Sequence, residues 1–549
     1  RSLTGVPVRD LYFQHWLRLI RHAVPDADHL KQSLRCQGQR IGPTVKFWIF
    51  MCVIRQRVDY SYRMPGLRHG KRESRSVQPA ADDNDSAFST HAPQYDRTGG
   101  IVHARCCRYG LTEIEFGGDM QHWLTATAAD LGRGIAAGDI DPVALTQTYL
   151  DAIDTHPLRD RIYARVTPDR ALAEAYAAQD RAVAGRRLSL LDGVPISWKD
   201  LFDSAGIATE SGSALLKDRV PPSDARVLQN ATAMGAVCLG KTHMSELAFS
   251  GLGLNPSTAT PPCINDADAV PGGSSSGAAA SVAFGLAACG IGSDTGGSVR
   301  IPSVWNDLVG LKTTSGRISL EGVVPLCLEF DTVGPLARSV EDAALALALL
   351  EGGRPADLQG ASLKGRRFAV LKTVALDDVR DVPRAAFDGA VEKLADAGAI
   401  IEPLEVPELT DAMTLSGVLY TSEAYGLWRD VIEANPHLMY DQILDRFRQG
   451  AKFSGPDYVD AWAKLRAARH AWNTAVARFD AVLCPTAPNL PPNVERLDAD
   501  KDYYVTENLL TLRNTRIGNL MGLCALTLPT GTPSCGVSLM GAPGSEEAL

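Results

Sequence analysis

The sequence has no long run of hydrophobic residues. A helix that crosses a bilayer needs about 20 apolar residues. The longest apolar runs have eight residues, and the most notable of them, Phe47 to Ile54, is flanked by Lys46 and Arg55. A buried segment is therefore a better interpretation of this run than a membrane span or a signal peptide, and we expect no membrane partner.

The sequence lacks the cysteine patterns that are typical of metal sites or of disulfide frameworks. The 11 cysteines are an odd number spread along the chain, with no Cys-x-x-Cys pair and no Cys/His cluster at zinc spacing. This distribution is typical of reduced thiols in a cytoplasmic protein. It predicts a cytoplasmic location and no metal site.

Positive charge is in deficit. The chain has 55 Lys and Arg against 64 Asp and Glu, a net charge of −9. General nucleic-acid binding needs a basic face, so we expect no nucleic-acid partner. The hydrophobic share of 45% and charged share of 22% are ordinary for globular proteins, which excludes collagen-like, coiled-coil and wholly disordered chains.

Residues 1–119 differ from the rest of the chain. They contain 18 Lys and Arg against 12 Asp and Glu, show no sustained helical or strand period, and are polar and irregular from Gly70 to Gly100. A basic arm that binds nucleic acid or a membrane surface is one interpretation. The favoured one is an irregular basic extension, either disordered or a mis-assigned upstream start. We therefore expect domain boundaries of 1–119 and 120–549.

From Met120 onward, strand-like and helix-like segments alternate. Asp141-Pro142 has the pattern of an N-cap followed by proline at the first helical position. The alternation predicts an α/β fold, a sheet covered by helices on both faces. The predicted helices are 143–153, 171–184, 224–234, 276–284 and 384–397, and the predicted strands are 194–198, 236–239, 286–291, 368–371, 400–404 and 481–483.

Two segments rich in glycine and serine are candidates for the chemistry: Pro271 to Gly277 and Gly292 to Pro302. Glycine lets the backbone approach a ligand closely, so such segments can aim several N–H groups at one point, as an oxyanion site requires. Flexible surface loops fit poorly because apolar stretches adjoin both segments. A phosphate-binding P-loop is also disfavoured, since neither segment ends in Gly-Lys-Ser/Thr.

The first segment also matches the Gly-x-Ser-x-Gly nucleophile elbow, with Ser275 at its centre. That motif must follow a buried strand, whereas Ile264 to Val270 is polar. The elbow also needs a histidine, and His437 and His470 both lie in polar helical contexts. A Ser-His-Asp triad is therefore the minor alternative.

The run from Gly272 to Pro302 resembles the amidase signature family, whose hallmark is Gly-Gly-Ser-Ser-x-Gly followed by Gly-Gly-Ser-x-Arg. Ser274 and Ser298 are separated by 24 residues, as in that family, and Gly193 to Phe202 resembles the strand that carries the family's catalytic lysine. The resemblance runs from about Leu124 to the end. Supporting stretches are Lys241–Glu246, Gly310–Lys312, Asp331–Pro335 and Asn514–Pro529.

The resemblance implies one large mixed β-sheet with helices on both faces and a Ser-Ser-Lys triad without a cofactor. Ser298 would be the nucleophile, Ser274 the proton relay behind a cis peptide bond, and Lys199 the base. The implied oxyanion-hole donors are the backbone N–H groups of Thr295, Gly296, Gly297 and Ser298. A lysine can act as a base only when neutral, which burial favours. Lys199 follows the apolar stretch 194–198, although a lone lysine at a strand end is more often a surface ion-pair partner.

The chain departs from the family pattern after Pro302, where Asn306 and Asp307 replace small residues and bring the pocket shape into question. It also ends at Leu549, where the family continues into a final helix, so we expect a shortened C-terminus. Met244, Leu247 and Phe249 are candidates for either an apolar pocket wall or the core.

Three functions remain open. The favoured one is a stand-alone amidase that cleaves a small-molecule amide, other than a peptide bond, to an acid and ammonia or an amine through an acyl-enzyme. The second is the glutaminase component of a tRNA-dependent amidotransferase; its Arg-Tyr-Asp-Gly-like stretch is missing near Leu419 to Tyr425. The third is an inactive binding or scaffold protein. A homodimer is left open.

Overall fold

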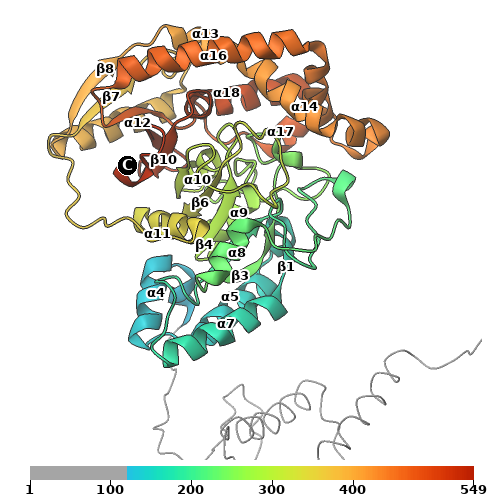
Figure 1. The fold of residues 1–549 in the computed structure, drawn as a ribbon, viewed down its shortest axis with the longest axis vertical. Coiled ribbons are helices and arrows are strands. Elements are labelled where there is room, and N and C mark those ends of the chain that lie inside the picture. The colour runs from blue at the N-terminus through green and yellow to red at the C-terminus, as the bar shows by residue number, and fades with distance from the viewer. Residues whose placement is uncertain (1–119) are drawn as a thin grey trace, which may run out of the picture. The chain divides into compact units, whose positions relative to one another are not determined.

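The computed structural model describes residues 120–549, and the predicted extension over 1–119 lies outside the described residues. Its framework is one mixed sheet of 11 strands in the order β1-β3-β2-β4-β6-β5-β10-β11-β9-β7-β8. The strands labelled in Figure 1 follow this order, from β1 to β8 at the far end of the sheet. The strands are β1 Tyr163–Val166, β2 Pro195–Lys199, β3 Val237–Thr242, β4 Cys289–Ser293, β5 Val309–Lys312, β6 Val333–Ala337, β7 Arg367–Leu371, β8 Ile400–Leu404, β9 Ala481–Pro485, β10 Cys524–Pro529 and β11 Gly536–Gly541.

Parallel and antiparallel pairs are combined in this sheet. β2 runs parallel to both β3 and β4, and β7 runs parallel to β8 and β9. The central strands β4, β6, β5, β10, β11 and β9 pair antiparallel. The α/β fold with a mixed sheet, expected from the alternation and the resemblance, is confirmed.

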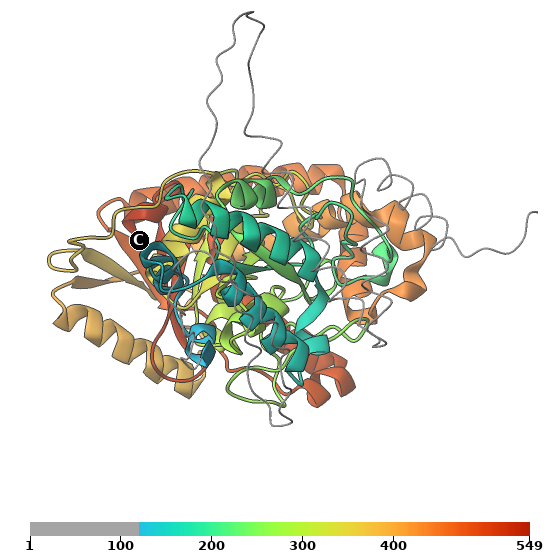
Figure 2. The same cartoon turned by 90° about the horizontal axis from the view of Figure 1, so that it is seen from below.

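Helices cover both faces of the sheet. In Figure 2 the helices of residues 142–183 lie in front, toward the β1–β3 end of the sheet, and the helices of residues 408–476 lie behind. The helices are α4 Ala128–Ala137, α5 Pro142–Thr155, α6 Arg159–Ile162, α7 Pro168–Val183, α8 Arg226–Ala233, α9 Ser276–Ala283, α10 Arg300–Trp305, α11 Val340–Glu351, α12 Asp381–Asp396, α13 Glu408–Thr414, α14 Ser416–Ala434, α15 Asp441–Arg448, α16 Gly455–Val476, α17 Val494–Ala499 and α18 Lys501–Leu520.

The start of α5 shows how local sequence sets an element. The side chain of Asp141 accepts hydrogen bonds from the N–H groups of Val143 and Ala144, and Pro142 occupies the first helical position. These N–H groups have no partner within the helix, so the cap satisfies them. The predicted N-cap is confirmed.

One predicted strand is displaced along the chain. The apolar stretch 286–291 predicts a strand there, but β4 covers Cys289–Ser293. The reason is that Leu286 still closes the end of α9, donating its N–H to the Ser281 carbonyl at 2.7 Å. The strand therefore begins later and ends directly at Asp294, inside the second glycine-rich segment.

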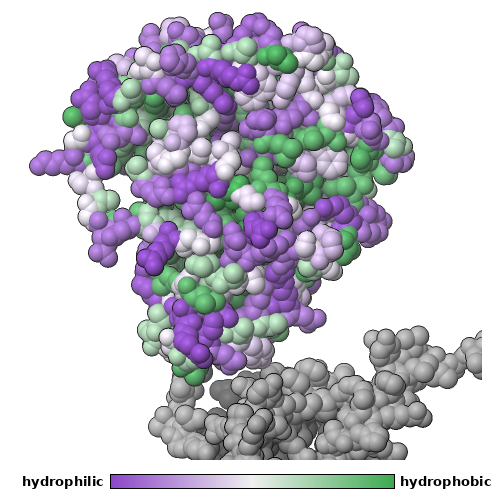
Figure 3. Space-filling model, in the orientation of Figure 1, coloured by the Kyte–Doolittle hydropathy of each residue, from purple (hydrophilic) through white to green (hydrophobic). Residues whose placement is uncertain are grey.

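The surface of the described part mixes hydrophilic and hydrophobic residues, with a hydrophobic band across the right half of the face in Figure 3. Exposed hydrophobic residues include Leu427 on α14 and Leu509 on α18. Within residues 120–549, no helix is both long and apolar enough to span a bilayer. The seven cysteines of this part are all free and buried.

Candidate active site

The end of β2 places Lys199 at the centre of the candidate site. β2 lies between β3 and β4 and runs parallel to both, so the carboxyl ends of the three strands meet at one edge of the sheet. The Lys199 Nζ donates a hydrogen bond to the Ser293 Oγ at 2.8 Å, at the end of β4, and another to the Ser274 Oγ at 2.7 Å. Two segments distant in the sequence thus meet at one amine.

Lys199 is fully buried, with 0% of its surface exposed. Burial lowers the pKa of Lys199 to about 7, because it disfavours the charged form, although the charges of Asp294 and Asp331 act in the opposite direction. The amine bonds two hydroxyls rather than a carboxylate. The surface ion-pair alternative for this lysine is therefore wrong.

Ser274 lies in the tight loop that leads into α9. The peptide bond between Gly273 and Ser274 is cis, as the resemblance implies. The Ser274 carbonyl accepts the Ser245 N–H at 3.1 Å. A Cβ at Gly273 would lie 2.6 Å from both the Gly253 nitrogen and the Ser245 Oγ. Only glycine fits there, so the loop holds Ser274 against Lys199.

Ser275 connects the first motif, residues 271–277, to the second motif, residues 292–302, through its backbone and its side chain. Its N–H donates to the Ser298 carbonyl at 3.3 Å, which brings the second serine motif beside the first. Its Oγ donates to the Ser293 carbonyl at 3.3 Å. The preceding residues form irregular loop rather than a strand, and His437 and His470 lie on other elements, residues 436–438 and α16. The elbow alternative gains no support.

The second motif is organised around the buried carboxylate of Asp294. It accepts the N–H groups of Gly297 at 2.8 Å and Val299 at 3.1 Å, and two hydrogen bonds from the Arg300 guanidinium at 2.9 and 3.0 Å. Burial alone would raise its pKa, but the charge of Arg300 holds the pKa of Asp294 well below its ordinary value. Arg300 also donates to the Asn519 side chain of α18 at 2.6 Å. The loop is thereby fixed to α18.

The backbone of this loop has N–H groups that no acceptor within residues 120–549 occupies. In the described part of the chain, the N–H groups of Thr295, Gly296 and Ser298 have no hydrogen-bond acceptor, whereas the Gly297 N–H is bonded to Asp294. Gly297 has φ +138°, and a Cβ there would lie 2.2 Å from the Thr515 Oγ1. Of the four implied oxyanion donors, three are thus available in this conformation.

A buried carboxylate also supports Thr295. The Thr295 Oγ1 donates to the Asp331 Oδ1 at 2.5 Å, and the other oxygen of Asp331 accepts the N–H groups of Leu326 and Cys327 at 2.9 and 3.0 Å. Burial raises the pKa of Asp331 to about 6. Asp331 therefore connects the second motif to the loop that precedes β6.

Two adjoining cavities lead to Ser298. The narrow one, about 20 Å³, is lined by Thr295, Gly296 and Ser298 together with Phe249 and Leu326. The wider one is about 420 Å³ and lies between α14, α15 and α18. The two share three lining residues, namely Tyr420, Arg446 and Arg516. Ser298 is thus the motif serine that lines a cavity.

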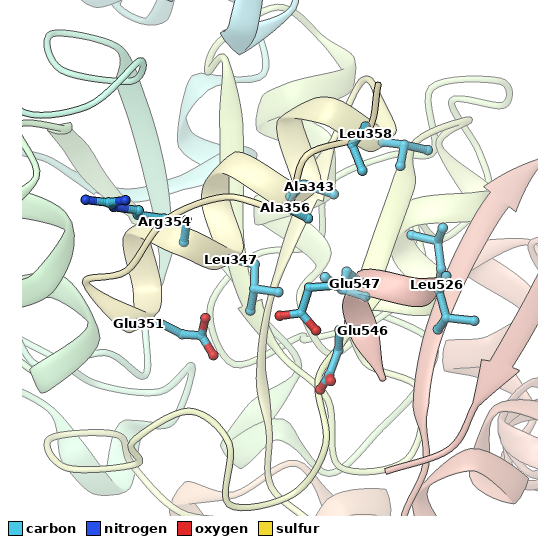
Figure 4. A pocket seen from close by; sticks show the side chains of 14 residues that line it. Ala343, Leu347, Glu351, Arg354, Ala356, Leu358, Leu526, Glu546 and Glu547 are labelled. Atoms are coloured by element: carbon cyan, nitrogen blue, oxygen red, sulfur yellow. The ribbon is translucent and has the colours of Figure 1, made fainter. Parts of the chain in front are cut away.

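A third cavity, drawn in Figure 4, lies between α11 and the C-terminal residues. It is about 40 Å³ and is lined by Leu347, Glu351, Leu526 and Glu546 among others. None of Lys199, Ser274 and Ser298 lines it. The candidate chemistry therefore belongs to the cavities at Ser298.

The unusual residues after Pro302 have structural partners. The Asn306 amide donates to the carbonyls of Pro271 and Pro302 at 2.8 Å each, which ties α10 to the first motif. Asp307 accepts the Ser534 N–H at 3.0 Å. Neither residue lines the two cavities at Ser298. Their effect is therefore on the packing behind the site.

The candidate apolar wall divides between pocket and core. Phe249 lines the narrow cavity, together with Ala248. Met244 and Leu247 are buried in the core. Residues 120–549 contain no group of three His, Cys, Asp or Glu side chains that could hold a metal ion.

Sequence reasoning missed several residues of the site. Ser293 and Asp294 lie inside the second motif, so their position next to the serines was a signal that could have found them. Tyr420, Arg446 and Arg516 gave no such signal. They come from three different helices, α14, α15 and α18, and only the folded chain brings them to the same cavities.

Comparison with known proteins gives consistent matches. The family described as Amidase matches residues 144–549. The chain is 35% identical over 392 residues to the 2-amino-5-chloromuconic acid deaminase of Comamonas testosteroni, covering 69% of this chain and 84% of the relative. It is 30% identical over 468 residues to a component of the glutamyl-tRNA(Gln) amidotransferase of Chloroflexus aurantiacus, covering 78% and 95%. The peptide amidase structure from Stenotrophomonas maltophilia is 28% identical with a TM-score of 0.66, covering 78% and 96%.

Proposed function

The chain belongs to the amidase signature family, and from this premise we propose that it hydrolyses a small-molecule carboxylic amide to an acid and ammonia or an amine. Ser298 would form a covalent acyl-enzyme. The observation that carries the proposal is the buried amine of Lys199, hydrogen-bonded to Ser274 at 2.7 Å behind the cavity that Ser298 lines.

The proposed reaction begins with a proton transfer. A serine hydroxyl is a weak nucleophile until a base removes its proton. Ser298 passes its proton to Ser274, and Ser274 passes its own to neutral Lys199, while the Ser298 Oγ attacks the amide carbonyl. The proton returns along the same route to the departing nitrogen. Water then attacks the acyl-enzyme by the same steps and releases the acid.

The proposed oxyanion hole uses backbone groups alone. The carbonyl oxygen becomes negatively charged in the tetrahedral intermediate, and the N–H groups of Thr295, Gly296 and Ser298 donate to it. These donors need no reorganisation during the reaction because Asp294 and Asp331 hold the loop. A single donor of this kind contributes roughly 10²–10³-fold in kcat.

A second candidate is the glutaminase component of a tRNA-dependent amidotransferase. The relative from Chloroflexus aurantiacus, which is 30% identical, bears the name of a component of such an enzyme. Against this candidate, the Arg-Tyr-Asp-Gly-like stretch expected for glutamine binding is missing around Leu419 to Tyr425. The stand-alone enzyme is therefore the proposed function, and the glutaminase is an outcome of its test.

The test is ammonia or amine release by the purified chain from a panel of aliphatic, aryl and amino-acid amides, with glutamine, a dipeptide and a peptide amide included. We expect release from at least one simple amide without a partner protein, and none from the dipeptide. Glutamine as the sole substrate would favour the glutaminase. Release from no member of the panel would overturn both.

A further inference from the structure

Two arginines, Arg446 and Arg516, line both the narrow cavity at Ser298 and the wide cavity between α14, α15 and α18. Arg446 of α15 donates to the Phe249 carbonyl at 2.9 Å, and its guanidinium carbon lies 4.4 Å from the centre of the Phe249 ring. Arg516 of α18 is buried and donates to the Ser416 Oγ at 3.4 Å. Within residues 120–549, neither forms an ion pair. Buried Arg300, by contrast, is paired with Asp294.

The hydroxyl of Tyr420, which has no hydrogen-bond partner within residues 120–549, belongs to the same junction of the two cavities. The side chain is only 6% exposed and lines both cavities. Its hydroxyl has no hydrogen-bond partner in the described part of the chain. Because an unpaired buried polar group costs free energy, this hydroxyl indicates that a ligand atom completes the site.

The remaining charges of the wide cavity do not neutralise the two arginines. Asp445 is the one acidic residue among its described lining residues, and it pairs with Lys501 at the same cavity. Positive charge is therefore in excess among the residues that line the wide cavity. Burying an unpaired charge is costly unless an opposite charge accompanies it.

We propose that the substrate carries a carboxylate in addition to its amide, and that Arg446 and Arg516 bind this carboxylate while the Tyr420 hydroxyl donates to it. The inference rests on the proposed function and narrows its substrate class to monoamides of dicarboxylic acids and related anionic amides. A guanidinium presents a planar set of donors that matches the two oxygens of a carboxylate. The uncharged amide end then lies toward Ser298, on the side of the narrow cavity.

The experiment compares monoamides of three- to six-carbon dicarboxylic acids with the methyl esters of the same monoamides. Each pair differs in one negative charge. We expect the parent protein to prefer the carboxylate member in kcat/KM. Arg446→Gln and Arg516→Gln should reduce that preference by about 10- to 100-fold, mainly through KM, since hydrogen bonds to charged groups are worth about that factor.

Two further variants control the comparison. Arg448→Gln removes an arginine from the same helix whose guanidinium pairs with Glu433 at the surface, so it should leave the preference unchanged. Arg446→Lys keeps the positive charge, so it should retain part of the preference that Arg446→Gln loses. Because lysine lacks the guanidinium that packs on Phe249, this variant also separates the effect of charge from the effect of lost packing. Analogues of the same amides with a phosphonate in place of the carboxylate test whether the two arginines bind another anion equally well.

Binding gives a readout that does not depend on turnover. Calorimetry with the Ser298→Ala protein should detect the monoamides but not their methyl esters, and Arg516→Gln added to it should abolish the signal. Equal turnover of both members of each pair, unchanged in the arginine variants, would overturn the inference while the amidase function stands. Charge-dependent binding without turnover of any amide would instead overturn the function alone. If there is neither charge-dependent binding nor turnover of any amide, the inference and the amidase function are both overturned.

Discussion

At the scale of single residues, the burial of Lys199 determines when the proposed relay can operate. Below its pKa of about 7 the amine is protonated and cannot accept a proton; above that value it is neutral and can. An exposed lysine, which titrates near 10.4, would be almost wholly charged at neutral pH. Burial would thus supply the base of the proposed relay.

We therefore predict that the kcat/KM for an amide rises with pH through about 7 and levels off above it. Lys199→Ala should remove this limb and reduce kcat by roughly 10²–10⁴-fold, the usual contribution of general-base catalysis. A pH–rate profile of the parent and the variant measures both effects.

The matched control is Lys464→Ala, since Lys464 is exposed and pairs only with Asp460 on its own helix. That variant should retain the limb. Near-parental kcat in Lys199→Ala with the limb unmoved would show that the relay is wrong, even if Ser298 is the nucleophile.

The sequence predicted the motif residues of the candidate site but not the arginines of its cavities. Lys199, Ser274 and Ser298 belong to short motifs with fixed spacing, and the folded chain brings their segments together. Arg446 and Arg516 are 70 residues apart in the sequence, with α16, β9 and α17 between them. Nothing in their sequence neighbours distinguishes them from surface arginines. Their common cavity depends on how α15 packs against α18, which sequence spacing does not encode.

At the scale of elements, the loop between β4 and α10 depends on one buried ion pair. Arg300 and Asp294 are both fully buried, and the same guanidinium binds Thr515 and Asn519 on α18. Removing one partner of a buried pair leaves the other charge uncompensated. The loop that carries Ser298 should therefore be sensitive to either residue.

We predict that Arg300→Leu lowers the free energy of unfolding by about 3–5 kcal/mol, the usual cost of breaking a buried pair. Urea unfolding followed by circular dichroism measures it. Arg226→Leu, which removes an exposed pair with Glu321, should cost only about 0–1 kcal/mol. Equal losses in the two variants would contradict the role given to the Asp294 pair.

Elements with strong local signals were predicted well. The helix after Asp141 and the strand at 368–371 agree with the structure because an N-cap and an apolar run define them. No bounds were predicted for the long helices α14, α16 and α18, although His470 of α16 was placed in a helical context. Tertiary packing defines them more than pattern does: α18 buries polar residues such as Asn508, Asn514 and Asn519, so no clean apolar stripe marks it.

At the scale of the whole molecule, the mixed sheet brings together segments from across the described chain. β2 and β4 supply Lys199 and Ser293, while α18, near the C-terminus, fixes the loop of Ser298. Alternating helices and strands predicted the fold class, but strand order cannot be derived from alternation. That the sheet mixes parallel and antiparallel strands came only from the resemblance, and its antiparallel centre was not predicted.

We predict that a chain beginning at Met120 retains amide hydrolysis, with kcat/KM within about twofold of the full chain, because every residue assigned to the site lies downstream. Side-by-side assays of both chains on one amide, with thermal unfolding as a control for folding, measure this. A misfolded or inactive shorter chain would show that residues 1–119 contribute to the domain, against the proposed boundary.

The central claim is that Ser298 forms the acyl-enzyme. Its most direct test is hydroxamate formation from an amide substrate and hydroxylamine, measured for the parent protein and for Ser298→Ala. We predict hydroxamate from the parent and none above background from Ser298→Ala, with the melting temperature of the variant unchanged. Comparable hydroxamate from a folded Ser298→Ala protein would contradict the claim and make Ser275 the leading candidate for the nucleophile.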